Sequence, residues 1–455
     1  MRTIGTHRST RNPSVVVKAI AGPTRLETLR RLAPNPFPRF EPFLFDLTRR
    51  YGNVVAFALP WRNYIFVNDP PVVKDLFVTQ QHAFSKSLGA RALKYLLGEG
   101  LLTSEDPLHR QMRRIVQPAF HRERIAAYAL AMQRHADDFV ERIVPGRPFD
   151  VHAAMTELTL RIATTTLFGS DESGSSSVVS DALRMMMEEF PYILLPFGQL
   201  RRRLPLPSTR RFERARALLD RVIYDVIARR RRAPGDGTDA LSLLLEAFDN
   251  DDVILSEGRN GRSRRTSDEQ IRDEVMTLFL AGHETTANLL TWTFYLLARN
   301  AGVEARLATA ARDGDAAFVD RVVHETLRLY PPAWLIGRES LHDVTLIDGS
   351  FVPAGTTVFV SPRVLHVRPD LYRGPMQFDP DRWIGWEPAP FAFVPFGGGA
   401  RRCIGEEFAW MEARIVLAAV ARRYHFAMGE GVSVATLPSV TLRPAGPVPM
   451  TARLR

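Results

Sequence analysis

The 455-residue sequence predicts a mainly α-helical fold with small β-sheets, of the α+β class. One observation is a single helical pattern that begins at Ser267 and continues to about Arg299. Another is that strand-like alternation is confined to three short regions, at 53–68, 344–360 and 438–454. A third is the composition, with 45% hydrophobic and 24% charged residues, which is enough to build a large core. No repeat or change in composition marks a second domain.

The first 22 residues are basic, and we expect a disordered leader at 1–22 followed by a single domain at 23–455. The short apolar run at 15–17 is followed at once by Lys18, and no convincing cleavage site comes after it. The chain contains no run of 18 or more apolar residues, so the sequence predicts no membrane-spanning helix. We therefore expect the protein in the cytoplasm.

The three strand regions are each bounded by turn signals. Residues 53–68 predict a hairpin that turns across 60–63. Residues 344–360 predict a second small β region, with Asp348 and Gly349 in one of its turns. Residues 438–454 are expected to close as a last hairpin. Most of the chain between these regions is predicted to be helical.

The middle of the long helix has an unusual composition. A capping box at 267–270 starts the helix, and apolar residues follow at helical spacing. Ala281, Gly282, Glu284 and Thr285 then place small residues, an acid and an alcohol inside an otherwise apolar stretch. A threonine here can bond back to an earlier carbonyl, and the glutamate can face solvent. The combination favours instead a kinked groove in which a gas molecule meets a proton relay.

Two pairs of charged residues lie at helical spacing. His109 and Arg113 are one turn apart in a basic segment, which alone is typical of a solvated helix face. Glu325 and Arg328 share a face of a helix predicted at 320–330, and Arg382 follows in the segment 378–383. Exposed pairs at this spacing are common and contribute little, so neither pair identifies a function by itself.

Cys403 is the only cysteine, so it forms neither an internal disulfide nor a multi-cysteine metal site. It can be a buried inert thiol, a nucleophile or one axial thiolate on a metal cofactor. Its flanks lack the patterns of a phosphatase, a papain-like protease or a phosphate-binding loop. Cys403 precedes a predicted helix that starts at Glu406, and it lies beside Arg401 and Arg402, which favours a thiolate.

The segment 396–405 resembles the cysteine loop of the cytochromes P450. It matches that pattern at every defining position, namely Phe396, Gly399, Arg401, Cys403 and Gly405. The resemblance implies a triangular, helix-rich prism with haem b between the long central helix and the helix after the cysteine. It also implies that Cys403 is the axial ligand of the haem iron, in a loop shaped by Phe396, Gly397 and Gly405.

The same resemblance gives the central helix its role. Ala281 and Gly282 would open a groove, while Glu284 and Thr285 would be the acid and the alcohol that supply protons. Many relatives have Asp at the position of Glu284.

The resemblance also places the basic residues and the charged pairs. The expected partners of the haem propionates are His109, Arg113, Arg338 and Arg401, with His366 as a looser match. The expected buried charge network that holds the cysteine loop consists of Glu325, Arg328 and Arg382.

For the whole protein the resemblance implies a soluble bacterial-type monooxygenase that inserts one atom of O2 into a C–H or C=C bond. Electrons would come from NAD(P)H through a separate ferredoxin or flavodoxin and its reductase. This acidic partner would dock on the cysteine side, and the candidate contacts are Arg110, Arg114, Arg122, Arg124 and Arg402. We expect a monomer.

The expected substrate is lipophilic. The segments that line the pocket in the family are apolar in this chain, and the candidate pocket residues are Leu88, Leu97, Leu195, Trp334 and Leu335. The apolar stretch 190–197, followed by arginines at 201–203, is similar to a lid with a basic rim that touches a lipid surface. Terpenoids are the first expectation and fatty acids the second. The hydrophilic segment 250–266 is expected to be a flexible surface loop.

The charge of the chain bears on whether it binds nucleic acid. The net charge of +10 is carried almost wholly by arginine, since Lys18, Lys74, Lys86 and Lys94 are the only lysines. The arginine runs lack interleaved aromatic residues, so nucleic-acid binding is not expected.

Two alternative functions stay open. One is a peroxide-driven peroxygenase, although it would usually lack the acid and alcohol. A haem-binding sensor or carrier without turnover also stays open, although it would leave the proton relay without a purpose.

Overall fold

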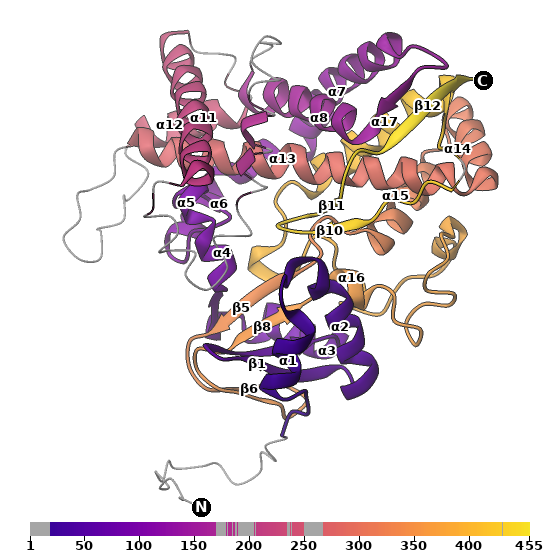
Figure 1. Cartoon of the computed structure of the whole chain (residues 1–455). Coiled ribbons are helices and arrows are strands. Elements are labelled where there is room, and N and C mark those ends of the chain that lie inside the picture. Colours follow the sequence, from indigo (N-terminus) through magenta and orange to yellow (C-terminus); the bar gives the residue numbers. More distant parts are fainter. Residues whose placement is uncertain are drawn as a thin grey trace, which may run out of the picture.

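Helices make up most of the computed structural model, which describes residues 19–169, 206–233, 239–249, 267–429 and 431–455 and isolated positions between 179 and 237. Most of the helices gather in one part of the molecule, and the main β-sheet lies below them in Figure 1 with α1, α2 and α3 beside it. The longer helices are α1 (Arg25–Leu32), α2 (Phe37–Tyr51), α6 (Leu108–Val116), α7 (Arg122–Arg142), α8 (Val151–Phe168), α11 (Pro207–Arg232), α12 (Ala240–Asp249), α13 (Ser267–Ala298), α14 (Ala301–Asp313), α15 (Ala316–Leu329) and α17 (Glu406–Arg423). The short ones are α3 (Pro70–Lys74), α4 (Leu88–Ala92), α5 (Lys94–Leu97) and α16 (Pro362–Leu365). The predicted class, mainly α with small sheets, is confirmed.

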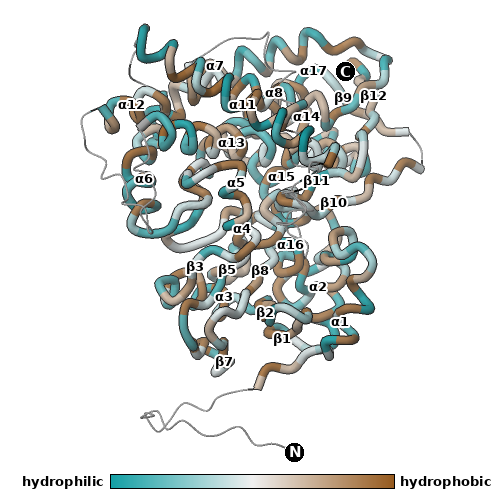
Figure 2. Tube along the Cα trace, turned by 60° about the vertical axis from the view of Figure 1, so that its left-hand side comes forward, coloured by the Kyte–Doolittle hydropathy of each residue, from teal (hydrophilic) through white to brown (hydrophobic). Residues whose placement is uncertain are grey.

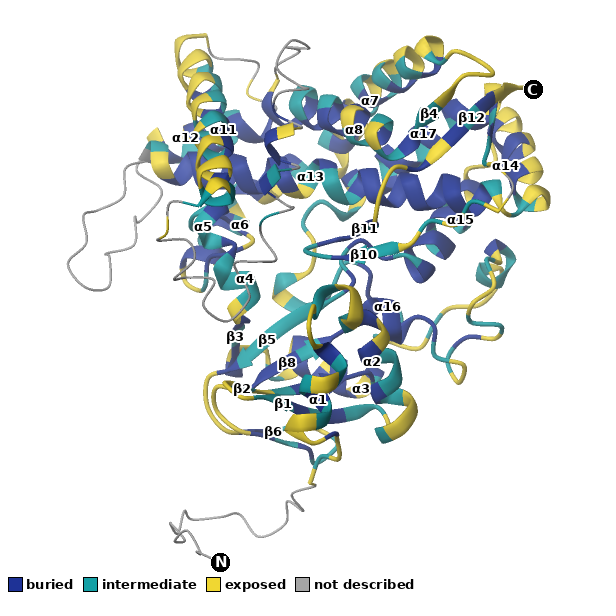
Figure 3. Ribbon diagram, in the orientation of Figure 1, coloured by how far each residue is buried: buried dark blue, intermediate teal, exposed yellow. Residues whose placement is uncertain are grey.

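The long central helix is α13, whose 32 residues match the predicted bounds closely. It crosses the helical part of the molecule and is buried over most of its length, as its dark blue colour in Figure 3 shows. It packs against α8, where the hydroxyl of Thr159 donates to the carbonyl oxygen of His283 (3.0 Å). Because the helix is buried on most sides, its buried residues lie around the whole circumference rather than on one face, and they include polar ones such as Arg272, Glu274 and Asn288.

The outer helices show the usual division into a buried and a solvent face. In α7 the buried residues Ile125, Tyr128, Met132, Ala136 and Val140 recur every three or four positions. Figure 2 shows the result as hydrophilic and hydrophobic segments that alternate along α7. These helices enclose one large apolar core around α13, and two smaller apolar clusters lie on the main sheet. Within the described residues, no helix combines the length and apolarity needed to cross a membrane.

The main sheet has five strands in the order β1-β2-β8-β5-β3. Its members are β1 (Val54–Leu59), β2 (Arg62–Val67), β3 (Phe84–Lys86), β5 (Ile336–Ser340) and β8 (Thr357–Val360). Antiparallel pairing of β1 with β2 confirms the first predicted hairpin. The predicted second β region, 344–360, contains three strands of two sheets. Strand β8 runs parallel to β2 and belongs to the main sheet. The strands β6 (Val344–Thr345) and β7 (Phe351–Val352) form a two-stranded sheet of their own.

The edge of this sheet also corrects the predicted leader. The carbonyl oxygen of Ala21 accepts a hydrogen bond from the amide of Ala56 in β1 (3.0 Å). A Cβ atom on Gly22 would lie 1.6 Å from the carbonyl oxygen of Ala56, so the two segments are in close contact. The packed structure therefore begins before residue 22. Residues 1–18 lie outside the described residues, as do the predicted lid at 190–203 and the predicted loop at 250–266.

The predicted hairpin at 438–454 is wrong. Strand β11 (Leu442–Pro444) pairs with β10 (Thr436–Pro438), which precedes it. Strand β12 (Pro449–Leu454) pairs instead with β9 (Tyr424–Ala427) and β4 (Pro148–Asp150). Three prolines between 444 and 449 remove amide donors that a hairpin of β11 with β12 would need.

Candidate functional site

The cysteine loop at 396–405 is held in shape by its own backbone. The amide of Cys403 donates to the carbonyl oxygen of Phe396 (3.0 Å), and the amide of Arg402 donates to that of Gly399 (3.1 Å). Gly399 has a φ of +67°, and a Cβ atom there would lie 1.8 Å from the carbonyl oxygen of Phe77. Only glycine fits this contact. The loop leads directly into α17, so Cys403 lies just ahead of a helix N-terminus as predicted.

The thiol of Cys403 is not held as a thiolate by the protein alone. The residue keeps an exposed surface, but desolvation by the surrounding protein raises the pKa of its thiol to about 11. The amide of Gly405 and the guanidinium groups of Arg113 and Arg402 lower this pKa without offsetting the desolvation. The prediction that the surroundings favour the thiolate is therefore wrong for the protein by itself. A coordinated metal ion deprotonates a thiol outright.

The middle of α13 is open on one side. Ala281 is exposed although it follows the buried Leu280, and Gly282, Glu284 and Thr285 are only partly buried. An exposed alanine in an otherwise buried helix indicates open space beside this turn. The Thr285 hydroxyl donates to the carbonyl oxygen of Ala281 (2.7 Å), so the back-bonding alternative is realised. The helix nevertheless continues without interruption to Ala298.

Glu284 has a partner that the sequence did not indicate. The hydroxyl of Thr441, in the turn between β10 and β11, donates to Oε1 of Glu284 (2.6 Å). The same hydroxyl oxygen accepts a hydrogen bond from Nδ2 of Asn288, one turn farther along α13 (3.3 Å). Glu284 is therefore anchored to a turn 157 residues away in sequence.

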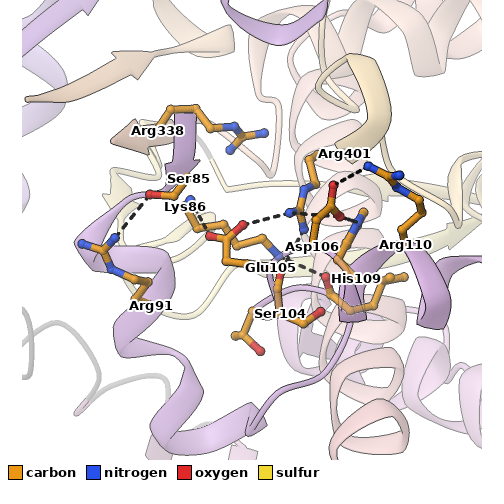
Figure 4. A network of polar contacts seen from close by, with 12 residues as sticks. Ser85, Lys86, Arg91, Ser104, Glu105, Asp106, His109, Arg110, Arg338 and Arg401 are labelled. Atoms are coloured by element: carbon orange, nitrogen blue, oxygen red, sulfur yellow. Dashed lines mark hydrogen bonds and ion pairs between the residues drawn. The ribbon is translucent and has the colours of Figure 1, made fainter. Parts of the chain in front are cut away.

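Arg401 is fixed by the segment that precedes α6 (Figure 4). Its guanidinium donates to the carbonyl oxygen of Ser104 (2.8 Å) and to Oε2 of Glu105 (2.8 Å). The other oxygen of Glu105 accepts the backbone amide of Lys86 (2.7 Å). Glu105 thus joins the end of β3 to the cysteine loop.

Lys86 is a buried ammonium group close to Arg401. Its Nζ donates to the carbonyl oxygens of Leu101 (3.1 Å) and of Leu102. Burial, reinforced by the charge of Arg401, lowers the pKa of Lys86 to about 7, and Glu105 opposes this effect. The side chain therefore holds the 101–102 turn whether or not it carries a proton.

Arg338, in β5, lacks an acidic partner within ion-pair distance in the described part of the chain. Its guanidinium donates to the carbonyl oxygen of Gly337 (3.1 Å) and lies over the ring of Phe77 (5.4 Å to the ring centroid). In Figure 4 no dashed line joins Arg338 to the other residues drawn. Burial lowers the pKa of Arg338 to about 10. A partly buried guanidinium without an ion-pair partner indicates that an anion belongs beside it.

The two predicted cations of α6 behave differently from each other. His109 is buried, and desolvation together with the charges of Arg401 and Lys86 lowers its pKa to about 3, so the ring is neutral. Arg113 donates to the carbonyl oxygen of Arg402 in the cysteine loop (2.8 Å). The structure thus brings His109, Arg113, Arg338 and Arg401 to one region with Lys86, where cations outnumber the acids Glu105 and Asp106.

The predicted charge network is assembled. Glu325 receives two bonds from Arg328 (2.8 and 2.9 Å) and one from Nε of Arg382 (3.2 Å). Glu325 and Arg328 are completely buried. The indole of Trp383 adds a further bond to Glu325 (3.0 Å). Both oxygens of the Glu325 carboxylate thus accept hydrogen bonds, which compensates the cost of burying its charge.

A comparison with protein families decides the assignment. The family model described as Cytochrome P450 matches residues 37–447. This chain is a cytochrome P450.

Several characterised members of the family are similar to this P450. Cyclooctatin synthase of Streptomyces melanosporofaciens is 37% identical over 88% of this chain and 88% of its own length. Cyclooctat-9-en-7-ol 5-monooxygenase of the same organism is 32% identical over 89% of each chain. Pentalenene oxygenase of Streptomyces avermitilis is 33% identical over 72% of this chain and 74% of its own.

Solved structures agree in fold. The crystal structure of the cytochrome P450DA heme domain superposes with a TM-score of 0.80 at 25% identity, covering 97% of this chain and 98% of that one. A 6-coordinated cytochrome P450 of Thermus thermophilus gives a TM-score of 0.71 at 28% identity, covering 90% of this chain and 98% of that one. The protein is therefore a P450 monooxygenase in fold and family.

The family implies haem, and the residues of this P450 fit that group. The cation-rich region around Arg338 and Arg401 has the charge to receive two propionates. Cys403 is an exposed residue of the hydrogen-bonded loop beside that region. The open turn at Ala281 supplies space on α13.

Three predicted haem or substrate contacts are corrected. His366 is completely buried, and its Nε2 accepts the amide of Val394 (2.9 Å), two residues before Phe396. Its carbonyl oxygen accepts from Arg328 (2.9 Å), so His366 connects the charge network to the cysteine loop rather than to a propionate. Among the pocket residues, Leu97 and Trp334 are 0% and 3% exposed in the core, because both pack against neighbouring side chains.

The other predicted pocket residues differ in position. Leu88 is 49% exposed at the start of α4, and Leu335 is partly buried against the core around Trp334. Leu195 lies outside the described residues.

Sequence reasoning missed Lys86, Glu105 and Thr441. One signal pointed to Lys86, since a lysine is rare in a chain whose positive charge is nearly all arginine. Glu105 and Thr441 carried no such signal, because their partners are distant in sequence and lie on other elements.

Proposed function

We propose that this P450 is a haem-thiolate monooxygenase that oxidises a terpenoid, with Cys403 as the axial ligand. The observation that carries the proposal is the rigid loop that presents Cys403 beside a cluster of under-compensated cations. Arg113, Arg338 and Arg401 would bind the propionates, and the neutral His109 would add a hydrogen bond. Phe396, Gly397 and Gly405 would shape the ligand loop.

The reaction needs two protons and two electrons for each O2. One oxygen atom enters the substrate C–H or C=C bond, and the other leaves as water. Bound haem would supply the activation of O2. The protein's part is to position the substrate and to deliver protons. Glu284 would take protons from solvent, and Thr285 would pass them toward the open turn at Ala281 and Gly282.

Terpenoid substrates are supported by the names of the relatives. Those names give pentalenene and cyclooctat-9-en-7-ol as compounds that the relatives oxidise. The exposed Leu88 offers an apolar contact on this chain. A fatty acid is the competing substrate class, and both classes enter the screen below.

Electrons would come from NAD(P)H through a ferredoxin or flavodoxin and its reductase. Arg110, Arg114 and Arg122 are exposed on α6 and at the start of α7, close in sequence to the residue that contacts the cysteine loop. Arg402 is also exposed, but both of its bonds go to Glu406 (2.6 and 2.7 Å). Arg110 is likewise paired, with Asp106 (3.1 Å), so an acidic partner would bind chiefly through Arg114 and Arg122.

The first test is the absorption spectrum of the purified protein, reduced and exposed to carbon monoxide. We expect a strongly red-shifted Soret band in the wild type and its loss in Cys403→Ser, because only a thiolate ligand gives that band. A band typical of histidine ligation, unchanged by Cys403→Ser, would overturn the assignment. Turnover with a surrogate ferredoxin and reductase on terpenoids and fatty acids then identifies the substrate class.

A further inference from the structure

The hydrogen bond between Thr441 and Glu284 depends on the length of the glutamate side chain. Glu284 stands where many family members have the shorter Asp, and its Oε1 reaches the Thr441 hydroxyl at 2.6 Å. An aspartate at the same place on α13 would lack one methylene and could not make this contact. The hydrogen bond is charge-assisted when Glu284 is ionised, which makes it shorter and stronger than a neutral one.

The Thr441 hydroxyl has its direction set by a second residue. Nδ2 of Asn288 donates to the Thr441 oxygen (3.3 Å), so the hydroxyl proton is directed to Glu284. Asn288 is completely buried, and its Oδ1 has no partner among the described residues. The buried Asn288 thus fixes the direction of the Thr441 hydroxyl.

The turn that carries Thr441 is itself rigid. The amide of Leu442 donates to the carbonyl oxygen of Pro332 (2.9 Å), and its carbonyl accepts the indole of Trp292 (2.9 Å). The indole of Trp334 donates to the carbonyl oxygen of Ser439 (2.9 Å). The turn is thus fixed to α13 and to the segment after α15, both of which are buried.

We infer that Thr441 is a positioning residue for proton delivery, which holds Glu284 by one oxygen so that the other can exchange protons with the relay. This inference rests on the proposed function. With Oε1 fixed by Thr441, rotation of the carboxylate is limited and Oε2 keeps a constant direction. Glu284 then acts as a general acid from a fixed position, and a general acid accelerates a reaction most when it is held in the correct orientation. A loose carboxylate would deliver protons more slowly, and NADPH oxidation would slow with it.

The test compares Thr441→Val, which keeps the shape and removes the hydroxyl, with Thr441→Ser, which keeps the hydroxyl. We expect Thr441→Val to slow NADPH oxidation about tenfold and to raise its solvent isotope effect. Thr441→Ser should stay within about twofold of the wild type. The matched control is Thr436→Val on the same hairpin, whose hydroxyl donates to Glu41 (3.0 Å) and not to Glu284. The control should behave as the wild type.

Two further measurements separate positioning from general damage. Infrared difference spectra of the resting protein, with Glu284→Gln to identify the band, should show a shifted Glu284 carboxylate stretch in Thr441→Val only. In a Glu284→Asp background, Thr441→Val should have no further effect on rate, because the contact is already lost. The single variant Glu284→Asp keeps the inference testable if Thr441→Val folds poorly, since it should show the same slowing.

Three results would overturn the inference. They are an unchanged rate and isotope effect in Thr441→Val, equal slowing in Thr436→Val, and wild-type turnover in Glu284→Asp. Failure of the proposed function is distinct, because it would show in the wild type as a missing carbon monoxide band or missing turnover. The infrared comparison would still report the contact between Thr441 and Glu284 in that case.

Discussion

Glu274 is a carboxyl group that lies completely buried in α13, close to the turn that Lys86 holds. Its Oε2 accepts the amide of Leu101 (2.9 Å), while the carbonyl of Leu101 accepts from Lys86. Desolvation raises the pKa of Glu274 to about 8, and the neighbouring Asp273 adds to the effect while Lys86 opposes it. The amide and the carbonyl oxygen of Leu101 are therefore bound by Glu274 and Lys86, whose pKa values are about 8 and about 7.

Stability should depend on pH through Glu274. Between pH 4.5 and about 8 the native protein holds a proton that the unfolded chain releases, so the free energy of unfolding falls as the pH rises. Glu274→Gln stays neutral, keeps an acceptor for the Leu101 amide, and should lack this fall. We expect it to match the wild type near pH 4.5 and to be more stable by about 2–4 kcal/mol at pH 9.

Urea unfolding at several pH values measures this difference. The control is Glu269→Gln, an exposed glutamate on the same helix. Parallel pH profiles for the wild type and Glu274→Gln would contradict the prediction.

At the scale of elements, the network around Arg328 joins α15 to the long segment before α17. Arg328 donates to Glu325 in its own helix and to the carbonyl oxygens of His366 (2.9 Å), Pro375 (2.6 Å) and Gln377 (3.0 Å). His366 continues the connection to Val394 and the cysteine loop. Helix α15 thereby helps to fix the cysteine loop through His366 and Val394.

Removal of Arg328 should be far more costly than removal of an exposed arginine. Arg328→Leu leaves Glu325 buried and poorly compensated, so we expect a loss of about 3–5 kcal/mol in the free energy of unfolding and weaker haem retention. Arg306→Leu is the control, because Arg306 makes two bonds of 2.7 Å to Asp381 on the surface. That exposed pair should contribute less than about 1 kcal/mol. Equal losses in the two variants, measured by urea unfolding, would refute the structural role.

For the whole molecule, a net charge of +10 should speed the approach of an acidic electron donor. Raising the ionic strength from about 0.01 to 0.15 M shortens the Debye length from about 30 to 8 Å, so we expect electron delivery to slow. Arg114→Glu combined with Arg122→Glu should lower the rate at low salt and flatten its salt dependence. Arg147→Glu is the control, since Arg147 follows the far end of α7, about 30 Å along the helix. Stopped-flow reduction of the haem measures the rate, and identical salt curves for the two sets would count against the docking face.

The sequence predicts contacts between residues that are close in sequence better than contacts between residues that are far apart in it. The cysteine loop, the length of α13 and the pair of Glu325 with Arg328 are local patterns, and they were predicted. Arg382 lies 57 positions from Glu325, and its place in the network was known only through the family resemblance. The contacts of Glu284 with Thr441 and of Arg401 with Glu105 join residues 157 and 296 positions apart, and no local pattern encodes them.

The errors have the same origin. A hairpin at 438–454 is favoured because neighbouring strands usually pair, but β11 pairs with the strand before it, β10, and β12 pairs with the more distant β9 and β4. Trp334 was assigned to the pocket by its place after α15, whereas its indole and ring complete a buried contact with the β10–β11 turn. The thiolate was inferred from nearby positive charge, without the desolvation that only the folded structure reveals.

The pairing of β12 with β4 has a consequence for biosynthesis. Asp150 caps α8 through the amide of His152, and the same oxygen accepts the amide of Val448, 298 positions later. The start of α8 therefore cannot reach its final surroundings until the segment from Val448 onward has been synthesised. Until then the start of α8 lacks its partner strand, so this contact of high sequence separation forms late in folding.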